Sequence, residues 1–187
     1  MKVTSEHIDD LMAGAKRVAM ENRERAGFSG QFTPVAIVVG PEGQHSVQAM
    51  TFRNFQEKRI LMRALSVTAR EMGVIAIVLV NDTYHVNSKN FTKHFNLAPD
   101  LKYDEFKKVY IELLDSEFGG SLANAPKELV SDALIVAMKG PLFKPRVWFL
   151  PYHEGVGDSI RWDEEEPEHE GEIMMLEDWW DEPETVH

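Results

Sequence analysis

The feature that most limits how this chain can fold is the placement of its negative charge. Twelve of the 31 Asp and Glu residues lie between Asp163 and Glu184, a stretch that contains no Lys or Arg. Outside this stretch, 19 acidic residues face 20 basic ones, so the remainder is almost neutral. A block of like charges repels itself and resists burial of its carboxylates. We therefore expect one folded domain in residues 1–161, followed by an extended, solvated acidic segment in residues 162–187.

The rest of the composition excludes several classes of protein. The chain has 187 residues and no cysteine, which excludes a disulfide framework, a thiolate metal site and a cysteine nucleophile. Its longest continuous apolar run, Val74–Val80, is far shorter than the ~18 residues that a membrane helix needs. The first ten residues lack the apolar region of a secretion signal. These features predict a cytoplasmic protein without a membrane span.

Hydrophobic periodicity divides the domain into helices and strands. Apolar residues recur at helical spacing in residues 5–25, 55–72 and 103–118, which predicts three amphipathic helices. Residues 34–52 contain a proline–glycine turn between two apolar runs and are typical of a β-hairpin. Shorter apolar or alternating runs predict further strands at residues 74–80, 133–138, 146–152 and 158–162.

This order of elements predicts an α+β domain, with a mixed, largely antiparallel sheet of five to six strands and about three amphipathic helices packed on it. The hairpin, the helix at 55–72 and the strand at 74–80 follow one another as strand, helix and strand. That order favours one right-handed crossover between two paired parallel strands. Residues 81–102 are polar, and we expect them to form an irregular connection.

Two polar stretches offer candidate catalytic groups. His153, Glu154 and Asp158 surround a glycine turn, where an imidazole and carboxylates can bind a divalent metal or act as acid and base. Asp82 and His85 follow a buried strand, and the carboxyl ends of parallel strands often carry sites. If these five residues converge, the chain is a metal-assisted or acid/base hydrolase. The simpler interpretation, which we favour, is a pair of polar turns, since adjacent His153 and Glu154 in a strand point to opposite faces.

Motifs that bind metals or cofactors are missing from the sequence. It contains no H-E-x-x-H, no Gly-x-Ser-x-Gly, no phosphate loop and no dinucleotide fingerprint. We therefore predict no cofactor and no metal site, and the sequence favours a non-enzymatic protein.

Three arginines form a cationic stripe on the outer side of the helix predicted at 55–72. They are Arg59, Arg63 and Arg70, and guanidinium groups bind carboxylates or phosphates through paired hydrogen bonds. An ordinary solvated helix face is the simpler interpretation. Nucleic acid is a poor candidate partner, because the twelve acidic residues repel phosphate. The acidic segment, from the same or a neighbouring subunit, is another candidate for binding at this stripe.

Large apolar side chains are embedded in the acidic segment. In a helix, Ile173, Leu176 and Trp180 share one face, as in helices that bind in a groove, and Trp179 adjoins them. Tryptophan is enriched at protein contacts. The segment can fold back on its own domain, bind another chain, or imitate the charge of a nucleic-acid backbone and bind a nucleic-acid-binding protein.

The sequence as a whole favours a small non-enzymatic binding protein whose acidic segment contacts a protein surface. That surface belongs to the same subunit, to a second copy in a homo-oligomer, or to a different protein. The predicted contact residues are Ile173, Leu176, Trp179, Trp180, Arg59, Arg63 and Arg70. The alternative function is the hydrolase built on His153, Glu154, Asp158, Asp82 and His85.

Overall fold

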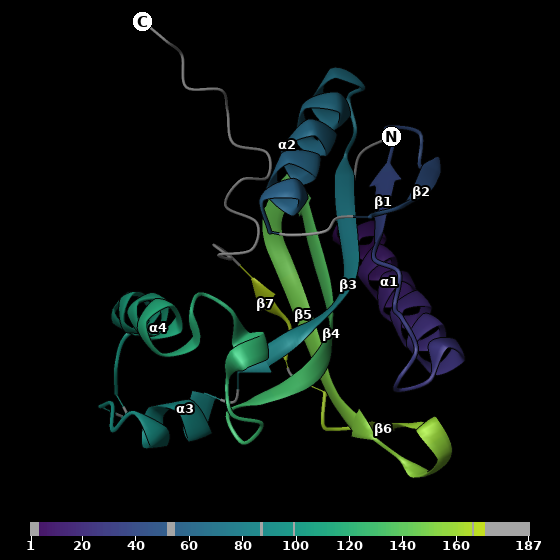
Figure 1. Ribbon diagram of the computed structural model, residues 1–187. Coiled ribbons are helices and arrows are strands. Elements are labelled where there is room, and N and C mark those ends of the chain that lie inside the picture. The colour runs from purple at the N-terminus through teal and green to yellow at the C-terminus, as the bar shows by residue number, and fades with distance from the viewer. Residues whose placement is uncertain (1–3, 52–54, 87, 99, 166, 171–187) are drawn as a thin grey trace, which may run out of the picture.

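A computed structural model describes residues 4–51, 55–86, 88–98, 100–165 and 167–170 of the chain (Figure 1). Its helices are α1 (Ser5–Ala26), α2 (Phe55–Glu71), α3 (Ser88–His94), α4 (Tyr103–Phe118) and the short 3-10 helices η1 (Leu122–Asn124) and η2 (Val156–Asp158). Its strands are β1 (Val35–Val39), β2 (His45–Ala49), β3 (Ala76–Val86), β4 (Val130–Gly140), β5 (Phe143–Glu154), β6 (Ile160–Trp162) and β7 (His169–Glu170).

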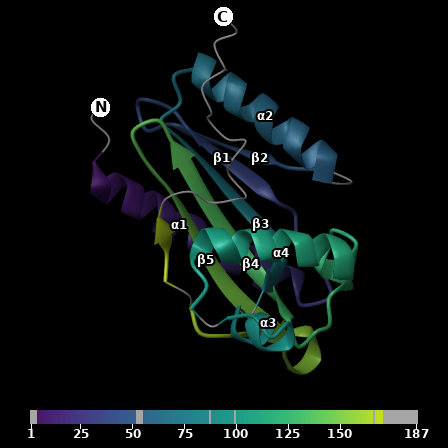
Figure 2. The same ribbon diagram turned by 90° about the vertical axis from the view of Figure 1, so that its left-hand side faces the viewer.

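The strands form one sheet in the order β2-β1-β3-β4-β5-β6, with β7 also paired to β5. Each of the described pairs is antiparallel. Helix α1 covers one face of the sheet, whereas α2 and α4 lie on the other (Figure 2). The predicted α+β class, with helices packed on a largely antiparallel sheet, is confirmed. No helix within the described ranges is long and apolar enough to cross a membrane.

The predicted pairing of parallel strands does not occur among the described residues. Strands β2 and β3 both pair with β1, each in the antiparallel sense, so β1 lies between them. The helix α2 therefore crosses over β1 rather than joining neighbouring strands. Strand β1 is apolar along its whole length and needs a neighbour on each side, whereas all five residues of β2 are exposed, as suits an edge.

The prediction of an irregular connection at residues 81–102 is wrong for much of that stretch. Strand β3 continues to Val86, and helix α3 follows it. The extension pairs with the start of β4, from His85 opposite Ser131 to Asp82 opposite Leu134. Polar side chains concealed this half of the strand, because backbone pairing with β4 needs no apolar pattern.

Two main clusters of buried side chains hold the layers together. Beneath α1, Met12, Ala15 and Ala19 pack on sheet residues that include Trp148 and Leu134. On the opposite face, α2 packs through side chains such as Met62 and Ala69, and that cluster also contains Val147 of β5. A third cluster, around Phe91 and Phe118, joins α3 and α4 to the end of the sheet. Both faces of the sheet are thus covered by helices, α1 on one face and α2 on the other.

Candidate functional site

The five predicted catalytic residues do not meet at one place. Asp82 points to the α1 side of the sheet, where its carboxylate accepts hydrogen bonds from Arg23 of α1 and from Tyr152. His85 lies three residues further along β3 and points to the opposite face, where its ring contacts Phe149 at a centroid distance of 5.1 Å. Alternation along β5 places His153 on the same face as Phe149. The two histidines thus share a face, but β4 separates their strands.

The remaining members of the proposed hydrolase site lie elsewhere. The backbone N–H of Ser29 donates to the Asp158 carboxylate at 2.7 Å, which lowers the pKa of Asp158 and joins its turn to the loop after α1. His153 pairs with Asp163 at 2.7 Å, and Glu154 is exposed. Among the described residues, no three His, Asp or Glu side chains are grouped so that they could bind a metal ion. Asp82 and His153 do act on one common group, because the charges of both influence the pKa of Asp132, which burial and Asp82 raise.

Asp82 belongs instead to a buried ionic network that the sequence analysis missed. The side chain of Arg23 is only 3% exposed, and its Nη1 lies 2.6 Å from Asp82 Oδ2. Its Nη2 donates to the carbonyls of Gly27 and Gly30, in the loop that follows α1. The Tyr152 hydroxyl donates to the second Asp82 oxygen at 2.7 Å. Burial, then the hydrogen bond to Asp82, raises the pKa of Tyr152 well above its usual value, so the phenol remains a proton donor.

The described start of the acidic segment is attached to the domain by a second set of ionic contacts, which we call the clamp. Its residues are Glu165, Glu168, Lys16, Arg146 and Trp148. Lys16 Nζ lies 3.0 Å from Glu165 and 2.7 Å from Glu168. Arg146 also pairs with Glu168, and the Trp148 indole N–H donates to Glu165 at 2.7 Å. Both glutamates thus pair with the domain, although the side chain of Glu165 is still 58% exposed and that of Glu168 is 24% exposed.

Partial burial and hydrogen bonding act in opposite directions on Glu168. Burial by itself raises the pKa of this carboxyl, but hydrogen bonds from Lys16 and Arg146 outweigh it. The pKa of Glu168 is consequently lower than usual, and the ionised form stabilises the folded state. Beyond the clamp, His169 pairs with Val147 and Glu170 with Arg146 in the β5–β7 ladder. The sheet thus fixes the position and direction of the chain at Glu170.

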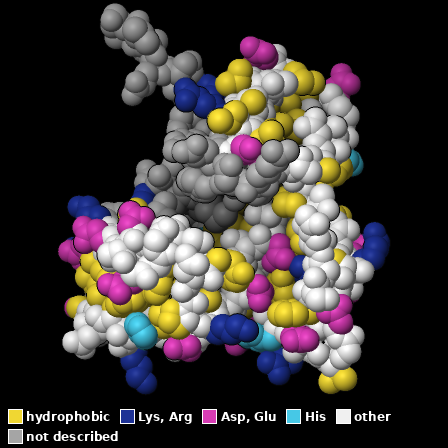
Figure 3. Space-filling view, viewed as in Figure 1, with side chains coloured by type: hydrophobic (Ala, Val, Ile, Leu, Met, Phe, Trp, Pro, Cys, Tyr) yellow, Lys and Arg dark blue, Asp and Glu magenta, His cyan; other side chains and the backbone are white. Residues whose placement is uncertain are grey.

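The outer side of α2 presents aliphatic and cationic side chains together. Ile60, Arg63, Val67 and Arg70 follow one another at intervals of three, four and three residues, which places them on one side of the helix. We call this surface the arginine face. Ile60 is 69% exposed and Val67 is 46% exposed, and Arg63 is exposed between them. Hydrophobic and basic side chains are visible next to each other over α2 in Figure 3. Of the predicted stripe, the side chain of Arg59 lies outside the described residues.

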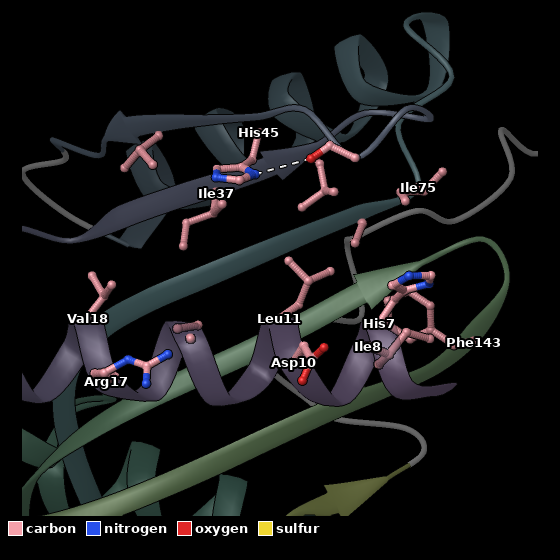
Figure 4. Close-up of a pocket in the computed structure, with 16 residues that line it drawn as sticks. His7, Ile8, Asp10, Leu11, Arg17, Val18, Ile37, His45, Ile75 and Phe143 are labelled. Carbon is pink, nitrogen blue, oxygen red and sulfur yellow. Dashed lines mark hydrogen bonds between the residues drawn. The ribbon is translucent and has the colours of Figure 1, made fainter. Parts of the chain in front are cut away.

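A groove of about 530 Å³ runs between α1 and the β1–β2 hairpin. Leu11 and Val18 of α1 line it on one side, and Ile37 and Val47 of the hairpin line it on the other (Figure 4). Its charged and titratable lining residues are of both signs: His7, Asp10, Arg17 and His45. No sequence pattern indicates this groove, because its walls come from two elements, α1 and the hairpin, that only the fold brings together.

The predicted contact residues of the acidic segment, Ile173, Leu176, Trp179 and Trp180, lie outside the described residues. The structure does describe the chain up to Glu170 and the surfaces around that point. In comparisons with models of protein families, with curated proteins and with solved structures, the chain matches none of them.

Proposed function

We propose that this chain is a non-enzymatic binding protein whose acidic C-terminal segment makes a protein contact through its apolar anchors. The observation that carries this proposal is the clamp. Glu165 and Glu168 hold the start of the segment against the domain. Lys16 Nζ lies 3.0 Å from Glu165 and 2.7 Å from Glu168, and Arg146 also pairs with Glu168. A tail that serves only for solubility needs no such attachment. The clamp gives residues 171–187 a defined point of departure.

The composition of residues 171–187, which we call the terminal stretch, supports the same function. It contains six acidic residues, no Lys or Arg, and six large apolar side chains between Ile173 and Trp180. Trp and Met are enriched in the centres of protein interfaces, and acidic residues around them favour association with a basic surface. The partner surface is part of the same subunit, of a second copy, or of a different protein. The negative charge disfavours nucleic acid as the partner.

The hydrolase remains the alternative from the sequence, but no observation favours it. Asp82 and His85 lie on opposite faces of the sheet, and Asp158 lies in η2, where it accepts a hydrogen bond from the loop after α1. An acid/base pair needs its groups within hydrogen-bond reach of one reacting atom. Asp82 is, moreover, already engaged by Arg23 and Tyr152. We therefore retain the binding function alone.

The proposal can be tested with the chain's own tryptophans. The chain has four, so incorporation of 5-fluorotryptophan gives four ¹⁹F resonances, which single Trp→Phe variants assign. A small shift between H₂O and D₂O marks a ring that is shielded from solvent. We expect Trp179 and Trp180 to be shielded, at every concentration if the contact is within one subunit and only at high concentration if it joins two copies.

A contact with a different protein requires a second measurement. In that case the two rings are exposed in the isolated protein, and a photo-crosslinking residue at position 179 joins the chain to its partner. The matched control carries the same residue at position 187. The proposal fails if three results are found together. Both rings stay exposed, removal of residues 171–187 leaves the oligomeric state unchanged, and crosslinking from position 179 gives the same products as crosslinking from position 187.

A further inference from the structure

We infer that the arginine face of α2 is the binding surface for the terminal stretch of the same chain. This inference rests on the proposed function and names the surface that the segment contacts. It concerns one surface, made of Ile60, Arg63, Val67 and Arg70, and one occupant, residues 171–187.

The arginine face has the complementary chemistry. Two aliphatic side chains, Ile60 and Val67, are left in solvent beside two guanidinium groups. An exposed face that mixes these types suits a peptide in which carboxylates alternate with large apolar anchors. The terminal stretch has that pattern, with Glu172, Glu177 and Asp178 placed around Ile173–Leu176 and ahead of Trp179. Carboxylates bind guanidinium groups in paired hydrogen bonds, while the anchors cover the aliphatic side chains.

Arg70 contributes an independent observation. Its Nε, like that of Arg23, is buried and has no hydrogen-bond partner in the described part of the chain. A buried guanidinium nitrogen without an acceptor is costly, and such groups in folded proteins are normally satisfied. An acidic side chain from the terminal stretch would provide the missing acceptor.

The described chain ends beside β5, a strand that contributes to the core beneath α2. His169 in β7 pairs with Val147, and Val147 belongs to the same buried cluster as Met62 and Ala69 on the inner side of α2. Ten residues separate Glu170 from Trp180, which span about 15 Å as a helix and up to roughly 33 Å when extended. Helix α2, with 17 residues, is about 25 Å long. The extended span of the terminal stretch thus exceeds the length of α2, as binding along the arginine face requires.

Two other surfaces suit this occupant less well. Lys16 and Arg146 already pair with Glu165, Glu168 and Asp9 in and around the clamp. The groove between α1 and the hairpin is apolar, but Asp10 offsets Arg17 among its lining residues. A strongly acidic peptide gains little from a surface of mixed charge. Charge complementarity thus favours the arginine face.

The test uses the same ¹⁹F resonances, in the full-length protein. In Arg63→Glu/Arg70→Glu, we expect the solvent isotope shifts of Trp179 and Trp180 to rise to those of a synthetic 171–187 peptide. Salt at 1 M should produce the same change in the wild-type protein, because it shortens the screening length to about 3 Å. Arg63→Glu alone, at an exposed position, should give part of the effect and guards against unfolding caused by the half-buried Arg70.

A matched control separates a specific contact from general repulsion. Lys93→Glu/Lys108→Glu makes the same change in net charge at exposed positions of α3 and α4, and we expect both rings to stay shielded in it. Combining Arg63→Glu/Arg70→Glu with Glu177→Lys/Asp178→Lys should restore shielding. Equal release in the Lys93/Lys108 control, or shielding that persists in Arg63→Glu/Arg70→Glu, overturns the inference.

The outcomes also distinguish this inference from the proposed function. Rings that are shielded in the wild-type protein but insensitive to Arg63 and Arg70 mean that the segment contacts another surface, so only the inference fails. Rings that are exposed in the wild-type protein and joined to a different protein by crosslinking have the same meaning. Rings that are exposed with no partner overturn both.

Discussion

At the scale of single residues, Arg23 is unusual because a charged side chain occupies a buried position in the core. It lies on the buried side of α1, in line with Met12, Ala15 and Ala19, where an apolar residue would be usual. Its guanidinium joins α1 to β3 through Asp82 and to the following loop through two carbonyls. A charge this deeply buried is stable only because nearly all of its donors have acceptors.

We expect Arg23→Met to destabilise the fold by about 3–5 kcal/mol, because it leaves the Asp82 carboxylate without its counter-charge. The double variant Arg23→Met/Asp82→Asn should lose less than the sum of the two single variants, since removing both partners leaves no unpaired charge. Urea unfolding of the four proteins in the cycle measures both quantities. A cost below about 1 kcal/mol for Arg23→Met would mean that the network is incidental to stability.

The lowered pKa of Glu168 predicts how one contact of the clamp responds to acid. A carboxyl whose pKa is lower in the folded than in the unfolded state stabilises the fold at pH values above its unfolded pKa, here about 4.5. This stabilisation is lost as the pH falls through the lower pKa of the folded state. We expect Glu168→Gln to destabilise the protein by about 1–2 kcal/mol at pH 7 and by much less at pH 3. Urea unfolding at the two pH values measures this difference. A cost that is the same at both would contradict the ionic role.

The role of a residue could be predicted from the sequence only where its signal lies in neighbouring residues of the chain. The position of Arg23 within the apolar periodicity of its helix is a local signal, and it could have identified a buried arginine. Its partner Asp82 lies 59 residues away in the chain, and only the packing of α1 on the sheet brings the two together. For the same reason, His85 and Asp82 were plausible neighbours in the sequence, although strand alternation sends them to opposite faces.

At the scale of elements, apolar patterns predicted the long helices and the buried strands, whereas strand segments made of polar residues were not predicted. Helices α1, α2 and α4 fall within two residues of the expected ranges because each has a continuous apolar side. The second half of β3 and the strand β7 have no such pattern, since they are stabilised by backbone pairing with neighbours. The antiparallel placement of β3 beside β1 was likewise not encoded locally, because either sense satisfies the same apolar run.

The clamp predicts that two truncations of the acidic segment have different effects. Removal of residues 171–187 should destabilise the domain less than removal of residues 163–187, because Glu165 and Glu168 remain and only the proposed contact with α2 is lost. Removal of residues 163–187 also takes Glu165 and Glu168 away from Lys16, Arg146 and the Trp148 indole, and we expect it to cost about 2 kcal/mol or more. Thermal unfolding of the two truncated proteins measures the difference. Equal melting temperatures would contradict a stabilising clamp.

At the scale of the whole molecule, the two edges of the sheet are protected differently. On one side, β6 and β7 are short and lie against β5 together with the clamp. On the other, β2 is a regular edge strand with all five residues exposed and no Lys, Arg or Pro among them. Exposed edges of this kind can pair with other chains, and many proteins protect them with charged residues.

We therefore expect Val47→Lys, in the middle of β2, to slow aggregation on heating while the free energy of unfolding changes little. The side chain of Val47 is 60% exposed, so the substitution removes little buried area. Leu142→Lys is a matched control, because Leu142 is 68% exposed but lies in the turn between β4 and β5. Light scattering during a temperature ramp compares the three proteins. Equal protection by both substitutions would assign the effect to added charge rather than to the edge.

The attachment of the chain at Glu170 has a thermodynamic consequence for anything that competes for the terminal stretch. A short flexible tether keeps its end at an effective concentration in the millimolar range near surfaces within reach. A contact with millimolar affinity, too weak to be detected between separate molecules, is then formed in a large fraction of single molecules. An external partner must overcome this local advantage, so its apparent affinity for the intact chain would be lower than for the free peptide.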